Sequence, residues 1–155
     1  MSNLNKWYWV LNDVSENNAG LSVRTRPIVK ELKRYFLNFE IVSFTEIYDS
    51  FLQRKTLKHA VGFIFSKPTS SINTFVMSEL RLMGYPVLAD IFDNYFVFST
   101  LTFEGAIPWQ GMRVLHSADS VIVSTPVLQQ YVENIAPTVA SVTVCDMLPD
   151  FGESA

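Results

Sequence analysis

Two carboxylates, Asp90 and Asp93, stand three positions apart at the end of an apolar run that begins at residue 85. Carboxylate oxygens are preferred ligands of Mg²⁺, but such a site also needs further ligands or substrate phosphates. His116, one of only two histidines, has no partner at ligand spacing. We therefore expect no metal site. Asp90 instead marks the carboxyl end of a predicted strand, which is the edge where open α/β sheets bind ligands.

A second polar turn lies within residues 112–128. Residues 121–123 form a short, wholly apolar run, typical of a parallel strand covered on both faces. Ser124 or Thr125 can accept hydrogen bonds from the first free N–H groups of a following helix, and Pro126 suits the first helical turn. The pattern predicts a strand, a tight turn and a helix, with the turn at the same carboxyl edge.

The remaining apolar runs predict the elements that position these turns. The expected strands are residues 7–11, 39–44, 60–65, 85–90, 121–123 and 140–145. The expected helices are residues 24–37, 45–57, 70–83, 108–117 and 126–133. This alternation predicts an α/β fold, a doubly wound (Rossmann-like) three-layer domain with a mostly parallel sheet of about six strands.

Length and composition favour one folded domain. The chain has 155 residues, of which 48% are apolar and 17% charged. We expect the domain at residues 1–150, with residues 151–155 beginning a linker or tail. No apolar run approaches the roughly 18 residues that span a bilayer, and no secretory leader pattern is present, so we expect a cytoplasmic protein. Cys145 is the single cysteine, and its apolar flanks predict a buried, reduced thiol.

Charge is distributed unevenly along the chain. Residues 1–81 carry eleven basic and seven acidic side chains, whereas residues 82–155 carry one basic and eight acidic ones. The helix expected at 24–37 has a basic face formed by Arg26, Lys30, Lys33 and Arg34. This face is either a solvated surface or a binding patch for anionic lipid head groups or a phosphorylated acceptor. Such a patch would imply peripheral binding at the inner face of the membrane. The acidic second half argues against a nucleic-acid partner.

An irregular stretch at residues 91–108 is rich in aromatic side chains. Loops usually lie on the surface, so aromatic density is unusual there. Either the stretch packs beneath the next helix, or it forms an apolar surface for another domain, a membrane or a ligand. The residues leave both alternatives open.

Three segments carry a resemblance to a known family. Residues 85–96 read YPVLADIFDNYF, residues 118–128 read ADSVIVSTPVL, and residues 142–150 read VTVCDMLPD. They resemble three segments of group-1-type glycosyltransferases with the GT-B fold. The first is similar to a strand followed by Asp-x-x-Asp and an aromatic residue, and the second to the segment Ala-Asp-x-Val-x-Val-Ser-Thr-x-x-Leu. The third is a more degraded match to the strand Val-x-Val-Ile-Pro-Asn-x-x-Asp before the interdomain linker. The polar loop with Ala19 and Gly20 is similar to their acceptor-side loop.

The resemblance implies the N-terminal half of an enzyme that transfers a sugar from a nucleotide-sugar to a glycan or lipid-linked acceptor. This half would hold the acceptor and be inactive alone. The donor would bind a C-terminal domain or subunit, with no cofactor in this domain and no metal. A cleft between two rigid domains would align the acceptor hydroxyl with the anomeric carbon and exclude water.

On this hypothesis, the acceptor side is formed by three polar segments. They are the loop with Asn17, Asn18 and Gly20, the turn with Asp90, Asn94 and Tyr95, and the turn with Ser124 and Thr125. Asp93 is the carboxylate expected to contact the acceptor hydroxyl, the alternative being a cap within its turn.

Two other interpretations stay open. One is a non-enzymatic α/β binding or signalling module. A receiver domain would carry an aspartate at the end of the third strand, where this chain has Ser66 and Lys67. A flavodoxin would carry a Ser/Thr-rich phosphate loop with glycine after the first strand, where residues 12–16 of this chain read NDVSE. The other is the acceptor subunit of a split glycosyltransferase.

Overall fold

A computed structural model describes residues 5–18, 20–35, 38–53, 59–92 and 106–145. Strands and helices alternate along these ranges. The strands are β1 (Lys6–Leu11), β2 (Phe39–Ser43), β3 (Ala60–Ser66), β4 (Val87–Ile91), β5 (Ser120–Val123) and β6 (Ala140–Thr143). The helices are α1 (Arg26–Lys33), α2 (Phe44–Leu52), α3 (Ser71–Leu82), α4 (Ala106–Ser117) and α5 (Pro126–Ile135), and a π-helical segment, η1 (Gly20–Thr25), precedes α1.

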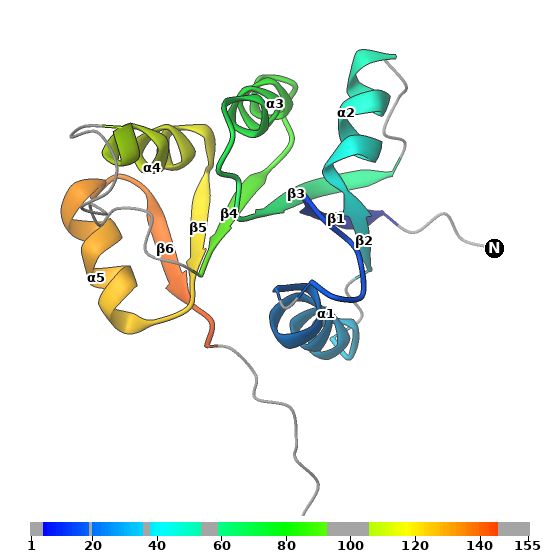
Figure 1. The fold of residues 1–155 in the computed structure, drawn as a ribbon, viewed down its shortest axis with the longest axis horizontal. Helices are drawn as coiled ribbons and strands as arrows, with labels where there is room; N and C mark the ends of the chain where they lie inside the picture. Colours follow the sequence, from blue (N-terminus) through cyan, green and yellow to red (C-terminus); the bar gives the residue numbers. More distant parts are fainter. Residues whose placement is uncertain (1–4, 19, 36–37, 54–58, 93–105, 146–155) are drawn as a thin grey trace, which may run out of the picture.

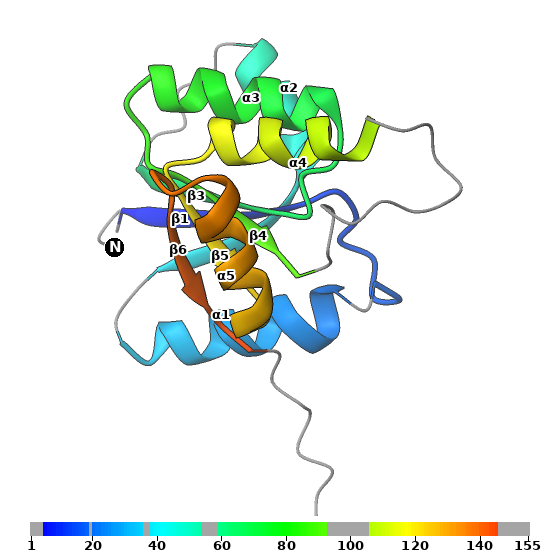
Figure 2. The ribbon, with the colours of Figure 1, turned by 90° about the vertical axis from the view of Figure 1, so that its left-hand side faces the viewer.

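The six strands form one sheet in the order β2-β1-β3-β4-β5-β6, and every neighbouring pair is parallel. The chain steps one way from β1 to β2 and the opposite way from β2 onward. Because crossovers between parallel strands are right-handed, this change of direction places α1 on one face and the later helices on the other. Figures 1 and 2 show α1 on one side of the sheet and α2, α3 and α4 on the other. The expected doubly wound α/β fold is confirmed.

The sheet is buried between two apolar layers. Successive strand residues point to opposite faces, so Phe63 and Phe65 of β3 belong to the layer that includes residues of α2, α3, α4 and α5. Ile64, between them, belongs to the layer beneath α1, together with Ile28 and Val29. Strands covered in this way leave their ends as the place for functional groups.

Local signals define the starts of α3 and α5. Ser70 caps α3 in a reciprocal arrangement with Asn73, and Thr125 caps α5, in which Pro126 is the first residue. Of the two capping candidates before α5, Ser124 and Thr125, the structure thus selects Thr125. Gly84 follows α3 with φ of +88°, the left-handed conformation that favours glycine after a helix.

Three local expectations were wrong. The helix expected from residue 24 begins at Arg26, because residues 20–25 form η1 and turn Arg24 inward. The helix before β5 begins at Ala106, so Pro108 is its third residue and does not open it. Cys145 is exposed, because β6 ends at Thr143 and the chain leaves the sheet before it reaches the cysteine.

Several expectations lie outside the described residues. They concern most of the aromatic stretch (residues 93–105), the turn residues Asp93, Asn94 and Tyr95, and the proposed domain end and tail (residues 146–155). Within the ranges that the structure describes, no helix has the length and apolar character to cross a bilayer.

Candidate functional site at the carboxyl edge of the sheet

Phe92, directly after β4, lies beside the turn that follows β5. The strands pair in register from Leu88 with Ser120 to Ile91 with Val123, so they end at the same level. The Ser124 hydroxyl then donates a 3.0 Å hydrogen bond to the carbonyl oxygen of Phe92. The sheet therefore joins the polar turn after β5 to the segment that follows Asp90.

Below this edge, Arg24 and Asp90 form a buried ion pair. The Arg24 Nη2 and Nε atoms lie 2.6 and 2.9 Å from Asp90 Oδ1, and the side chains are 2% and 0% exposed. The third guanidinium nitrogen donates to the carbonyl oxygen of Val144 at 2.9 Å. Buried charges require a partner and further hydrogen bonds, and Arg24 and Asp90 supply both to each other.

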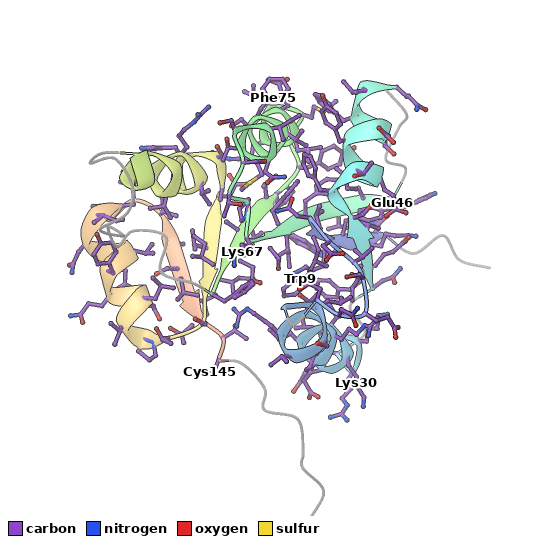
Figure 3. The ribbon with its side chains drawn as sticks, in the orientation of Figure 1. Trp9, Lys30, Glu46, Lys67, Phe75 and Cys145 are labelled. Atoms are coloured by element: carbon purple, nitrogen blue, oxygen red, sulfur yellow. The ribbon has the colours of Figure 1, made fainter. Side chains whose placement is uncertain are left out.

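The network continues through the first and third strands. Asp90 Oδ2 accepts a 2.7 Å hydrogen bond from the Ser66 hydroxyl, and Ser66 Oγ accepts a 2.8 Å hydrogen bond from Trp9 Nε1. Trp9 is fully buried between the sheet and α1, as Figure 3 shows. The four side chains connect β1, η1, β3 and β4 at the point where the strand order changes direction.

Segment η1 places Arg24 in this network. Leu21, Arg24 and Thr25 of η1 are buried, whereas Arg26, the first residue of α1, is exposed. π-Helical turns are rare and occur frequently at functional sites. Thr25 Oγ1 is the one buried side-chain oxygen of the described residues without a hydrogen-bond partner. Sequence reasoning missed Arg24, although an aspartate inside an apolar strand was a signal that a buried cation had to lie nearby.

Phe92 connects the buried network to the surface. The centre of its ring lies 5.5 Å from Arg24 Cζ and 5.6 Å from Lys67 Nζ, distances typical of cation–π contacts. Lys67 has φ of +52°, a left-handed conformation that is uncommon for a residue with a side chain. Its N–H donates to Asp90 O and its carbonyl accepts from Asn12 Nδ2, which fixes the loop after β3 against its neighbours.

A cavity of about 410 Å³ opens beside Phe92, and we call it the α5 cavity. Its lining residues are Phe92, Ser124, Thr125, Val127, Leu128, Gln130, Tyr131 and Asn134. Thr125 Oγ1 accepts the Leu128 N–H at 3.2 Å and so holds the first turn of α5 at the cavity mouth. The volume falls in the range of small-molecule sites.

A larger hollow, of about 630 Å³, lies at the opposite edge of the sheet. Arg81 and Asp119 in its wall form an ion pair at 2.8 Å, and Asp119 also accepts the Val87 N–H. These contacts join α3 to the starts of β4 and β5, a structural role. The carboxyl edge stays the candidate site, because open α/β sheets bind ligands at that edge.

The structure brings several of the predicted acceptor residues together. Gly20 packs against the Phe92 ring so closely that an added Cβ would lie 3.2 Å from it. Asn18 closes the preceding loop by bonding to Asp13 O and to the Leu21 N–H. Ser124 and Thr125 line the α5 cavity, and Asn17 is exposed in the loop after β1.

Asp90 lies deeper than a direct contact with an acceptor requires. Its carboxylate is fully buried and is bonded to Arg24 and Ser66. Acceptor contact by Asp90 stays a prediction, and the role that the geometry supports is positioning of the segment that follows. Among the described residues, no three His, Cys, Asp or Glu side chains lie close enough to hold a metal ion.

The basic face of α1 is partly neutralised. Arg26 pairs with Glu16 at 3.4 Å and Arg34 with Glu31 at 2.7 Å. Lys30 and Lys33 are exposed, and Figure 3 shows Lys30 projecting from α1 away from the sheet. An anionic contact through this face stays a prediction.

Comparison with known proteins identified no family for this chain. No protein-family model and no curated protein sequence matches it.

Proposed function

We propose that this domain is the acceptor-holding half of a glycosyltransferase that uses a nucleotide-sugar donor. One observation carries the proposal: the two sequence segments that most resemble such enzymes include the neighbouring strands β4 and β5, and the hydrogen bond from Ser124 Oγ to Phe92 O joins them directly after these strands. Two residues about thirty positions apart in the chain thus meet at the edge where α/β sheets bind ligands.

The proposed roles follow from position. The buried Arg24–Asp90 pair holds the start of the segment after β4 in place, and Asp93 lies three residues further along the chain. Asp93 would accept the proton of the acceptor hydroxyl as its oxygen bonds to the anomeric carbon of the donor. The bond from that carbon to the nucleoside diphosphate breaks, and the diphosphate leaves with the bonding electron pair. A carboxylate within hydrogen-bond reach of a reacting hydroxyl can act as such a base.

The donor would be held by a second domain or subunit. This half would align the acceptor, and closure against the donor-binding partner would exclude water that otherwise hydrolyses the donor. A cytoplasmic site would be compatible with a nucleotide-sugar donor, and the exposed Lys30 and Lys33 would favour contact with an anionic membrane face.

Substitution of Asp93 tests this proposal. The protein is isolated from its native cell together with any donor-binding domain or subunit that accompanies it. In this preparation, Asp93→Asn should lower the rate of nucleoside diphosphate release in the presence of acceptor by about 100-fold or more. The reason is that loss of a general base typically costs 10²–10⁴-fold in rate. The matched control is Asp49→Asn, an exposed position on α2, which should leave the rate unchanged.

One result would contradict the role given to Asp93, and another would contradict the proposed function itself. Unchanged turnover in Asp93→Asn would remove this residue from the site. Tight binding of flavin, with no turnover of any nucleotide-sugar, would favour the non-enzymatic binding module instead. Co-purification of a separately encoded donor-binding chain would identify the split form of the enzyme.

A further inference from the structure

The α5 cavity is walled by one face of α5. Four lining residues lie on α5 at spacings of three, one and three positions, which places them together on the helix surface: Val127, Gln130, Tyr131 and Asn134. Phe92 also lines the cavity. All four helix residues are exposed. This face of α5 is therefore accessible to solvent.

Among the described residues, the lining carries no charged side chain. Arg24 contacts the Phe92 ring, but Asp90 neutralises its charge within the protein. A site that recognises phosphate or carboxylate typically presents arginine, lysine or free backbone N–H groups. Here the Thr125 side chain already accepts the Leu128 N–H at the start of α5. The cavity is suited to an uncharged ligand.

The polar groups in the wall match hydroxyls. Within the described ranges, neither the Gln130 nor the Asn134 amide forms a hydrogen bond with another protein group. Each amide offers two N–H donors and one carbonyl acceptor, and a hydroxyl both donates and accepts. Two such amides one helical turn apart can bind adjacent hydroxyls of one ring.

The apolar part of the lining suits the other side of such a ring. Phe92 and Tyr131 supply aromatic surface, and the buried Leu128 supplies an aliphatic floor. Ligand sites commonly combine apolar and aromatic walls with a few placed polar groups in a volume of this order. A pyranose has the corresponding pattern, with hydroxyls around its rim and C–H groups on its faces.

We propose that the α5 cavity binds an uncharged pyranose, the end of a glycan acceptor, through the amides of Gln130 and Asn134 and the rings of Phe92 and Tyr131. This inference rests on the proposed function, and it narrows the acceptor to a neutral sugar. It assigns Gln130 and Asn134 to substrate recognition, a role that sequence reasoning did not give them.

Binding of simple glycosides to the 155-residue chain tests the inference. The probes are methyl β-D-glucopyranoside, methyl β-D-galactopyranoside and methyl α-D-mannopyranoside at tens of millimolar, with glucose 1-phosphate as the anionic comparison. Proton–nitrogen correlation NMR reports directly on the side-chain amides, which are assigned from the signals that disappear in Gln130→Leu and Asn134→Leu. At least one neutral glycoside should shift both amide signals in a saturable way.

The variants provide the second readout. The Gln130→Leu/Asn134→Leu double variant should weaken glycoside binding at least about tenfold, because it removes two hydrogen-bonding groups. Both positions are exposed, so the fold should be unaffected, and its retention is checked from the remaining amide signals. The control is Gln53→Leu at the exposed end of α2, which should bind like the unaltered chain.

Two outcomes would overturn the inference. One is the absence of any α5 shift with all three neutral glycosides, and the other is stronger binding of glucose 1-phosphate than of the glycosides. Neither result would contradict the proposed function, since an enzyme can transfer sugar to an acceptor held elsewhere on this edge. The proposed function is tested separately through Asp93→Asn. Absence of transfer by the unaltered protein with any nucleotide-sugar, with glycoside binding intact, would instead indicate a sugar-binding module.

Discussion

Replacing Arg24 by methionine is expected to lower the free energy of unfolding by about 3–5 kcal/mol, the usual cost of leaving one partner of a buried ion pair alone. Asp90 is fully buried, so its carboxylate would lose its main counter-charge without gaining water. Urea unfolding followed by tryptophan fluorescence measures the change, because Trp9 lies in the same network.

Two controls separate the buried pair from a general loss of charge. The double variant Arg24→Met/Asp90→Leu should recover most of the lost stability, since a buried pair replaced by apolar groups is often neutral in effect. Arg34→Met, which breaks the exposed pair with Glu31, should change stability by less than about 1 kcal/mol. A double variant as unstable as the single one would show that Arg24 acts mainly through its other contacts.

The second large effect is expected from Gly62→Ala in β3. An added Cβ would clash with the Trp7 ring, lying 2.6 Å from Cη2, and would stand 2.9 Å from the carbonyl oxygen of Pro86. That carbonyl accepts the Phe63 N–H at 2.9 Å, so it cannot withdraw without weakening the β3–β4 ladder. We expect a loss of about 1–3 kcal/mol, as for other overpacked interiors, measured by urea unfolding.

Two further variants locate the strain. Combining Gly62→Ala with Trp7→Phe removes the ring atoms that clash and should restore part of the stability, leaving the contact with Pro86. Gly84→Ala has no neighbour within 4 Å of the added Cβ, and it should cost only about 1–2 kcal/mol for the left-handed backbone. A Gly62→Ala variant as stable as the unaltered chain would mean that the strands shift apart at little cost.

Much of the fold is local in origin, and for this reason it was predictable. Residues 121–123 form an apolar run too short for a helix, and Thr125 with Pro126 begins the next helix through contacts within one turn. A helix was likewise expected at residues 70–83, and in the structure Ser70 caps α3 and Gly84 follows it. These signals depend on neighbours in the sequence, and so they can be read without tertiary structure.

The expectations that failed depend on distant contacts. The residues around Arg24 predict a helix that includes it, but the side chain is buried with its partner Asp90, which is 66 residues away in the sequence. Cys145 sits in an apolar run, but its exposure depends on where β6 stops pairing with β5. Gln130 and Asn134 have no feature in the sequence that distinguishes them from other surface residues. Only the cavity beside Phe92 makes their amides candidates for ligand binding.

Periodicity and capping act over a few residues, and they specify an alternation of strands and helices, the start of α5, and polar turns at the carboxyl ends of two strands. Tertiary structure alone decided that Arg24 turns inward to Asp90, that Phe92 lies between a buried ion pair and an open cavity, and that the Asp90 carboxylate is withdrawn from solvent. The physical reason is burial: a charge or an amide acquires its role from what surrounds it, and the packing of the sheet decides those surroundings.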